Sequence, residues 1–124
     1  MSIFAFQESD LVGAWVGKAA DATECRYVFN ADGSVINLVE SEGFKQWFGP
    51  LGVKAKYKFS EKSSLWELDI YDFENFQLAG ITFFGIVEPM DKQTFKMQGM
   101  PSNHGGRPGS FNEEAIIFTK VNSK

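Results

Sequence analysis

The sequence predicts an all-β protein: an eight-stranded antiparallel up-and-down barrel with a short N-terminal helical turn. Short runs of alternating apolar and polar residues recur along the 124-residue chain, which is the pattern of half-buried strands. Gly and Pro fall between these runs, where they mark turns. A meander of eight strands tends to close into a barrel because closure removes its exposed edges.

We expect all elements to belong to one domain, residues 1–124. Ser9 or Asp10 would cap a helical turn that ends at Val12. The eight strands are expected at residues 13–19, 24–30, 35–40, 53–59, 65–71, within 77–88, 94–99 and 114–121.

The connection between the second and third strands contains Asp32-Gly33, a strong signal for a two-residue type I′ turn. A hairpin centred on this pair places Phe29 opposite Ile36 on the inner face. Asn37 would then face outward, because successive side chains of a strand point to opposite faces.

The fourth and fifth expected strands each have one charged face. Lysines alternate with apolar residues in the fourth strand, and Glu67 and Asp69 alternate with apolar residues in the fifth. Opposite charges would therefore pair across the outer face. The sixth strand breaks the alternation, so it carries a bulge at Gly80 or Gly85 or is covered on both faces, and a turn at 88–91 follows it.

The composition excludes several classes of protein. With 12 basic and 16 acidic residues the net charge is −4, whereas a nucleic-acid binder is basic. Aromatic residues make up 15% of the chain, too many for a disordered protein, and no apolar run approaches the roughly 20 residues that span a bilayer.

Cys25 is the single cysteine and is expected to be buried on the inner face of the second strand. Without a disulfide or a signal peptide, a cytoplasmic location is expected.

Three short motifs are similar to those of lipocalin-like proteins of the calycin superfamily. Leu11-Val12-Gly13-Ala14-Trp15 resembles the G-x-W signature that begins the first lipocalin strand, just after a short helical turn. Tyr27-x-Phe29-x-x-Asp32-Gly33 and Arg107-Pro108-x-x-Phe111 resemble features of small bacterial lipocalin-like domains. The resemblance implies the same barrel, with a small ligand bound at its open end.

The resemblance also implies that Gly13 and Trp15 have structural roles at the closed end of the barrel. The family tends to place an arginine over the signature tryptophan. Here Arg107 lies in a connection at the opposite end, so Lys120 is the better-placed cation. We expect Trp15 to plug the core and Lys120 to make a cation–π contact with it.

Alternate connections of an up-and-down barrel share one end, which we call the mouth. One of them, residues 43–50, contains Phe44, Trp47 and Phe48, although loops are normally polar. These side chains plug the mouth, cover a bound ligand or form a patch that contacts another protein. Large aromatic residues on the inner faces leave little empty volume, so a cavity would be small and near the mouth.

Two further connections reach the mouth. The connection before the sixth strand contributes Phe76, and the connection before the eighth contributes His104 and Arg107 among several glycines. Glycines beside these two residues form either an anion-binding nest of backbone N–H groups or a flexible surface loop. His104 as a haem ligand, as in some lipocalin-like haem binders, is a further alternative.

The residues favour binding over catalysis. No catalytic residue, metal site or cofactor is expected, because the sequence has no nucleophile elbow, no paired metal-ligand spacing and no P-loop. The predicted function is to bind a small apolar or amphipathic molecule at the mouth. The residues expected to bind it are Phe44, Trp47, Phe48, Phe76, His104 and Arg107.

Two other functions remain open. One is a protein-interaction module, either an inhibitor or a self-associating domain such as a homodimer, that uses the aromatic connection or an outer face of the barrel. The other is an enzyme of unrecognised type. Neither nucleic acid nor a membrane is an expected partner.

Overall fold

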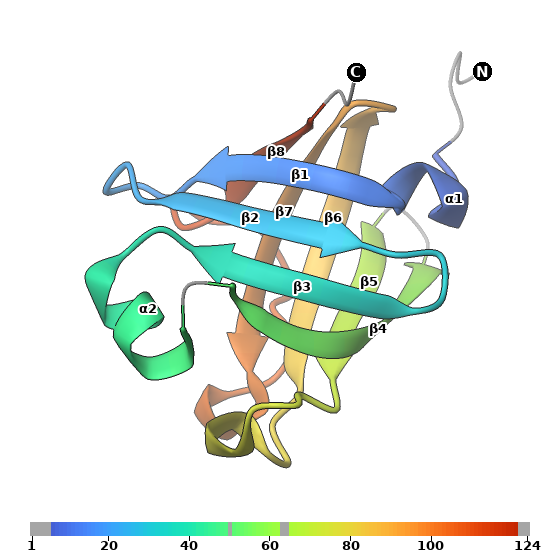
Figure 1. Ribbon diagram of the computed structural model, residues 1–124. Helices are drawn as coiled ribbons and strands as arrows, with labels where there is room; N and C mark the ends of the chain where they lie inside the picture. The colour runs from blue at the N-terminus through green and yellow to red at the C-terminus, as the bar shows by residue number, and fades with distance from the viewer. Residues whose placement is uncertain (1–5, 50, 63–64, 122–124) are drawn as a thin grey trace, which may run out of the picture.

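The chain folds into a closed eight-stranded antiparallel β-barrel, as predicted (Figure 1). A computed structural model describes residues 6–49, 51–62 and 65–121, except for the side chains of Trp47, Lys62, Phe76 and His104. Each strand pairs with the next, and β1 pairs with β8 to close the barrel. In chain order the elements are α1 (Glu8–Leu11), β1 (Gly13–Lys18), β2 (Glu24–Phe29), β3 (Ser34–Val39), α2 (Glu42–Phe48), β4 (Val53–Lys62), β5 (Leu65–Tyr71), η1 (Phe76–Leu78), β6 (Phe83–Asp91), β7 (Thr94–Pro101), η2 (Ser102–His104) and β8 (Ile116–Lys120).

Aromatic rings fill much of the barrel interior, as the alternation along the strands predicts. Phe29, Phe95 and Phe118 are buried, and the rings of Phe95 and Phe118 stack with 5.4 Å between their centroids. Phe59 stacks on Trp66 at 4.4 Å. Burying a side chain of this size stabilises the fold by about 1.5–3 kcal/mol.

Trp15 closes one end of the barrel beneath α1. It is completely buried, and its indole Nε1 donates a hydrogen bond of 2.8 Å to the carbonyl oxygen of Leu11. The Lys120 Nζ lies 5.4 Å from the centre of the indole and donates to the carbonyl oxygen of Asp10 at 2.9 Å, which confirms the expected cation–π contact. A Cβ at Gly13 would lie 2.8 Å from the Cε of Lys120, so the glycine of the signature leaves room for this lysine.

The β2–β3 connection is a three-residue loop rather than the predicted two-residue turn. The Asn30 amide donates to the carbonyl oxygen of Ser34 at 2.9 Å, and the Gly33 amide donates to that of Asn30 at 3.1 Å. Gly33 has a φ of +91°, the left-handed conformation that the last position of such a loop requires. The additional loop residue shifts the whole hairpin by one position.

This shift exchanges the two faces of β3, because a slip of one residue turns every side chain over. Phe29 pairs with Val35, so the prediction that it pairs with Ile36 was wrong, and Ile36 faces outward. Asn37, which was expected on the outer face, lies opposite Tyr27 on the inner face. The correct register therefore brings an amide side chain into the barrel.

Gly33→Ala is expected to lower the free energy of unfolding by about 1–2 kcal/mol, because alanine is strained at positive φ. No heavy atom lies within 4 Å of the position that a Cβ would take at Gly33, so steric overlap adds nothing to this cost. Gly43→Ala is the matched control, since this position is equally open but lies within α2. The control should gain about 0.5–1 kcal/mol in urea denaturation. Equal effects of the two substitutions would contradict the loop geometry.

Residues 41–52, expected to be an irregular connection, contain helix α2. The Ser41 hydroxyl oxygen accepts a hydrogen bond from the Phe44 amide at 3.1 Å and so caps the first turn. Gly49 ends the helix with a φ of +88° and an amide that donates to the carbonyl oxygen of Lys45. The part of this connection that carries the aromatic residues is therefore a short helix and not an irregular loop.

Strand β6 extends beyond residue 88, where the predicted range ended. Residues 88–91, expected to form a turn, belong to the strand. Pro89 is tolerated there because β5 pairs with β6 only as far as Val87, so the missing N–H leaves no partner unpaired on that side. The register irregularity follows Pro89, whereas a bulge was expected at Gly80 or Gly85.

Candidate functional site

A cavity of about 270 Å³ lies at the end of the barrel opposite Trp15. The β1–β2, β3–β4, β5–β6 and β7–β8 connections all reach this end, which is therefore the predicted mouth (Figure 1). The cavity is small and lies at the mouth, as predicted. Its lining is formed by Cys25, Tyr27, Asn37, Val39, Phe83, Met97, Gln98, Gly99, Glu114, Ile116 and Phe118.

Tyr27 forms the deeper part of the cavity wall. It pairs with Trp15 across strands β1 and β2. Its ring stacks on Phe29 with 5.5 Å between centroids and meets Phe118 edge-on at 5.3 Å. Only 7% of the residue is exposed, and burial raises the pKa of its hydroxyl. Within the part of the chain that the structure describes, this hydroxyl forms no hydrogen bond.

Asn37 and Cys25 add polar atoms to the same wall. The Asn37 Nδ2 donates to the carbonyl oxygen of Arg26 at 3.0 Å, and among the described residues its Oδ1 has no partner. The Cys25 Sγ lies 4.0 Å from the carbonyl oxygen of Thr23, and burial raises the pKa of the thiol. Across the described residues, no group of three or more His, Cys, Asp and Glu side chains could hold a metal ion.

The facing wall of the cavity is mostly apolar. The Phe83 ring lies against Gly99, so that a Cβ at residue 99 would overlap the ring. Met97 and Phe118 are almost completely buried beside it. Glu114 is the charged residue of the described lining, which includes neither Lys nor Arg. The cavity thus combines one wall able to form hydrogen bonds with one mostly apolar wall, and it has no described cation.

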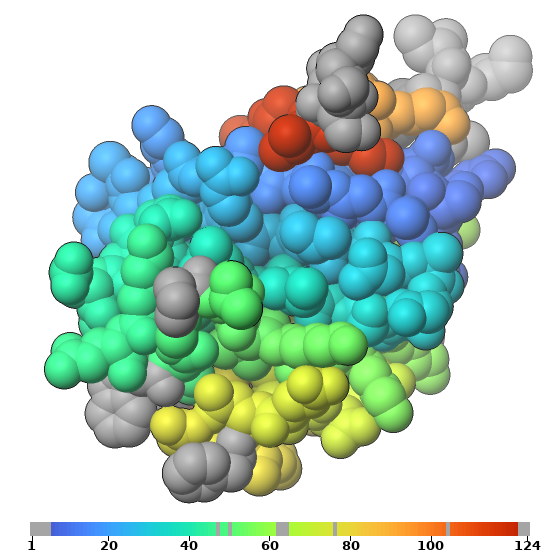
Figure 2. Space-filling view, viewed as in Figure 1, coloured from blue at the N-terminus to red at the C-terminus, as the bar shows by residue number. Residues whose placement is uncertain are grey.

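The aromatic residues predicted to bind the ligand do not form this wall. Phe44 and Phe48 lie along α2 with 4.9 Å between their ring centroids, and neither lines the cavity. Helix α2 lies beside β3 at the left of the molecule, and the β5–β6 connection lies at the bottom (Figures 1 and 2). The side chains of Trp47, Phe76 and His104 lie outside the described residues, so their roles stay predictions.

Arg107 lies on the outer face of the barrel, away from the cavity. Its Nη2 is 2.6 Å from Asp69 Oδ1, its Nε is 3.6 Å from Glu67 Oε1, and its Nη1 donates to the carbonyl oxygen of Gly85 at 3.0 Å. The guanidinium also covers the Phe84 ring at 5.0 Å. The prediction that Arg107 orients a ligand does not fit this placement, because its donors already serve two carboxylates and a backbone carbonyl.

The segment that carries Arg107 crosses the outer face of the sheet, and we call residues 105–115 the strap. The Asn112 amide donates to Gln98 Oε1 at 2.8 Å, and the Lys96 Nζ lies 5.0 Å from the centre of the Phe111 ring. Gln98 faces outward from β7 and is nevertheless buried. The strap therefore acts as an outer layer over part of the barrel.

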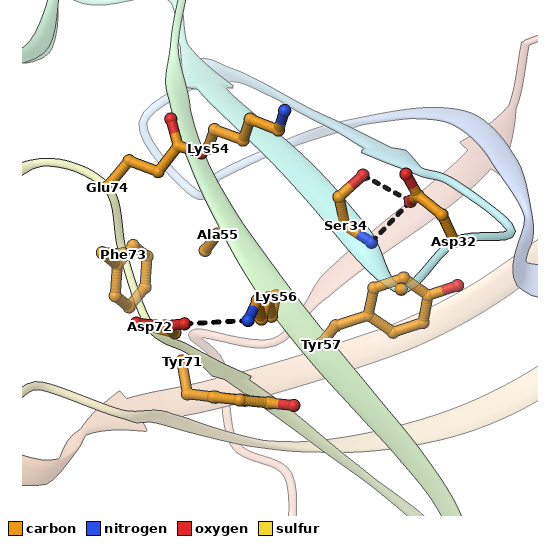
Figure 3. Close-up of a pocket in the computed structure, with 11 residues that line it drawn as sticks. Asp32, Ser34, Lys54, Ala55, Lys56, Tyr57, Tyr71, Asp72, Phe73 and Glu74 are labelled. Atoms are coloured by element: carbon orange, nitrogen blue, oxygen red, sulfur yellow. Dashed lines mark hydrogen bonds and ion pairs between the residues drawn. The ribbon is translucent and has the colours of Figure 1, made fainter.

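A wider and more open depression, of about 670 Å³, lies beside β4 (Figure 3). Two of its charged groups pair with each other: the Lys56 Nζ is 3.1 Å from Asp72 Oδ2, and both side chains are 62% exposed. The Asp32 carboxylate accepts two hydrogen bonds from Ser34, which hold its pKa below the usual value. Charged groups this exposed interact weakly in water, so this depression is a weaker candidate than the mouth cavity.

Comparison with known proteins supports the fold alone. No protein-family model and no curated protein matches the chain. Among solved structures, the crystal structure of Treponema pallidum Tp0751 (pallilysin) is similar, with a TM-score of 0.58 over 94% of this chain and 85% of that one. The two sequences are 8% identical over this match, so the likeness extends to the barrel and not to its chemistry. Among the described helices, none combines the length and apolarity needed to cross a bilayer.

Proposed function

We propose that this protein binds a small, partly apolar molecule in the mouth cavity and does not transform it chemically. The observation that carries the proposal is a barrel interior that is filled at one end and hollow at the other. Small-molecule sites are typically concave and largely apolar, with a few polar groups that fix orientation. At about 270 Å³ the cavity suits a molecule smaller than a typical drug.

Val39→Trp is expected to weaken binding of naphthalene, used as an apolar probe, by at least about tenfold, because the larger side chain fills the cavity. Leu38→Trp is the matched control, since the neighbouring side chain points to the outer face. Ligand-observed NMR titration measures both affinities. Equal affinities of the two variants, or no binding to the unmodified protein, would overturn the cavity as a binding site.

We further propose that the chain is a lipocalin-like member of the calycin superfamily. Two features support this finer assignment: the eight-stranded barrel and the burial of Trp15 under Lys120 at its closed end. The cation over the tryptophan is a lysine here, where the resemblance implies an arginine. The contact has the same electrostatic origin, although a lysine lacks the planar group that stacks on a ring.

A second candidate function is interaction with another protein. Leu51, just after α2, is 87% exposed, and Ile117 on the outer face of β8 is 48% exposed. Exposed apolar side chains of this size are found at interfaces. Native mass spectrometry distinguishes the two functions, since a retained ligand adds a small mass whereas self-association gives a multiple of 13.9 kDa.

A further inference from the structure

The two tyrosines at 7% exposure in the barrel interior differ in one respect. The Tyr57 hydroxyl donates to the carbonyl oxygen of Asn30 at 3.0 Å, as buried tyrosines usually do. The Tyr27 hydroxyl has no such bond within the described residues, although the side chain is buried and lines the cavity. Because burial raises its pKa, this hydroxyl stays protonated and remains an available donor.

An amide side chain on the neighbouring strand lines the same cavity as Tyr27. Asn37 is directly opposite Tyr27 in the β2–β3 register, and side chains at such positions have Cβ atoms roughly 5 Å apart. Because a carbonyl oxygen can only accept, the bond to Arg26 assigns the amide nitrogen of Asn37 to that contact. Its Oδ1 is thus left as an acceptor in a residue that lines the cavity together with Tyr27.

The remainder of the cavity restricts the charge and shape of a ligand. Phe83, Met97 and Phe118 contribute two aromatic rings and a thioether to the lining, which favour an apolar aromatic body. The described lining offers an anion no positive side chain, and Glu114 adds a carboxylate. A buried anion without a paired cation is strongly disfavoured, so a fatty acid is a poor fit.

We propose that the mouth cavity is specific for a neutral planar heterocycle that presents an N–H and a C=O side by side, as a lactam does. The ligand carbonyl accepts from the Tyr27 hydroxyl, the ligand N–H donates to Asn37 Oδ1, and the ring lies against Phe83 and Phe118. This assignment rests on the proposed binding function and names the chemical class of its ligand. A lactam edge would meet both polar groups at once, and a few polar groups of this kind fix the orientation of a ligand in an apolar cavity.

The test compares 2-quinolinone, which has a lactam edge, with naphthalene, which has the same fused-ring outline and no polar edge. The unmodified protein should bind 2-quinolinone about five- to tenfold more tightly than naphthalene. Tyr27→Phe should remove most of this preference without weakening naphthalene binding. Tyr27→Phe should also leave stability nearly unchanged, because the hydroxyl has no bond to lose.

Tyr57→Phe is the matched control, since it removes a hydroxyl that already has a partner outside the cavity lining. It should destabilise the fold and leave the preference for 2-quinolinone intact. N-methyl-2-quinolinone, which keeps the carbonyl and lacks the N–H, should lose the part of the preference that depends on Asn37.

The outcomes distinguish a failure of the binding function from a failure of the proposed ligand class. If naphthalene binds as tightly as 2-quinolinone and Val39→Trp weakens both, the cavity is a site and the lactam class is wrong. If Tyr27→Phe leaves the preference unchanged, the role of the Tyr27 hydroxyl is wrong. If neither probe binds the unmodified protein, the binding function and the ligand class both fail.

Discussion

Trp15→Ala is expected to lower the free energy of unfolding by about 3–5 kcal/mol. The indole has no exposed surface, its ring centre lies 4.5 Å from that of Phe95, and Lys120 covers one side of it. Alanine would leave a sealed void between α1 and the barrel, which the surrounding strands can fill only partly. Urea denaturation followed by circular dichroism measures the loss.

Two milder substitutions separate packing from polar contacts at this end. Trp15→Phe keeps an aromatic ring but leaves the Leu11 carbonyl oxygen without its donor, which should cost about 1–3 kcal/mol. Lys120→Met loses the cation and its bond to Asp10 but keeps an apolar stem, so about 1–2 kcal/mol is expected. A loss below about 1 kcal/mol for Trp15→Ala would contradict the role of this residue as the plug of the barrel.

The barrel could be predicted because its signals are local. Apolar residues alternate with lysines in β4, and this alternation alone specifies a strand with one buried face. The tryptophan after Gly13 marks the first strand, and the lysine that covers it follows from the pairing of β1 with β8. Helix α2 also had a local signal, since Ser41 and Gly49 are typical first and last residues of a helix.

The cavity could not be predicted in the same way, because its polar wall depends on one residue of register. Asp32-Gly33 is compatible with a two-residue turn and with the last two positions of a three-residue loop. The choice decides whether Asn37 or Leu38 lies opposite Tyr27 and faces the interior. The packing of the whole barrel determines the register, and the residues around the turn do not indicate which register forms.

Arg107 illustrates a second limit of sequence reasoning. Its position in a mouth connection suggested a ligand contact, whereas the strap carries it to the outer face of β5. Glu67 and Asp69 were expected to pair with the lysines of β4, and they pair with this arginine instead. The contact joins residues about 40 positions apart, and such contacts are set by the path of a long connection.

Arg107→Met is expected to lower the free energy of unfolding by about 2–3 kcal/mol. The Oδ1 atom of Asp69 is buried, and removal of the guanidinium leaves this carboxylate without its cation. The carbonyl oxygen of Gly85 loses its donor at the same time. Methionine keeps an apolar stem over Phe84, so the loss reports mainly on the polar contacts. Urea denaturation measures the stability, and hydrogen exchange should show faster exchange along the strap.

Arg26→Met is the matched control, because Arg26 forms an ion pair of the same 2.6 Å length with Glu24. The side chain of Arg26 is 48% exposed, whereas that of Arg107 is 22% exposed. Exposed ion pairs contribute about 0–1 kcal/mol, so the control should change stability little. Adding Asp69→Asn to Arg107→Met should recover part of the loss, since the unpaired charge is then absent. Equal losses for the two arginines, or no recovery in the double variant, would show that the carboxylate of Asp69 does not depend on Arg107 and that other contacts hold the strap.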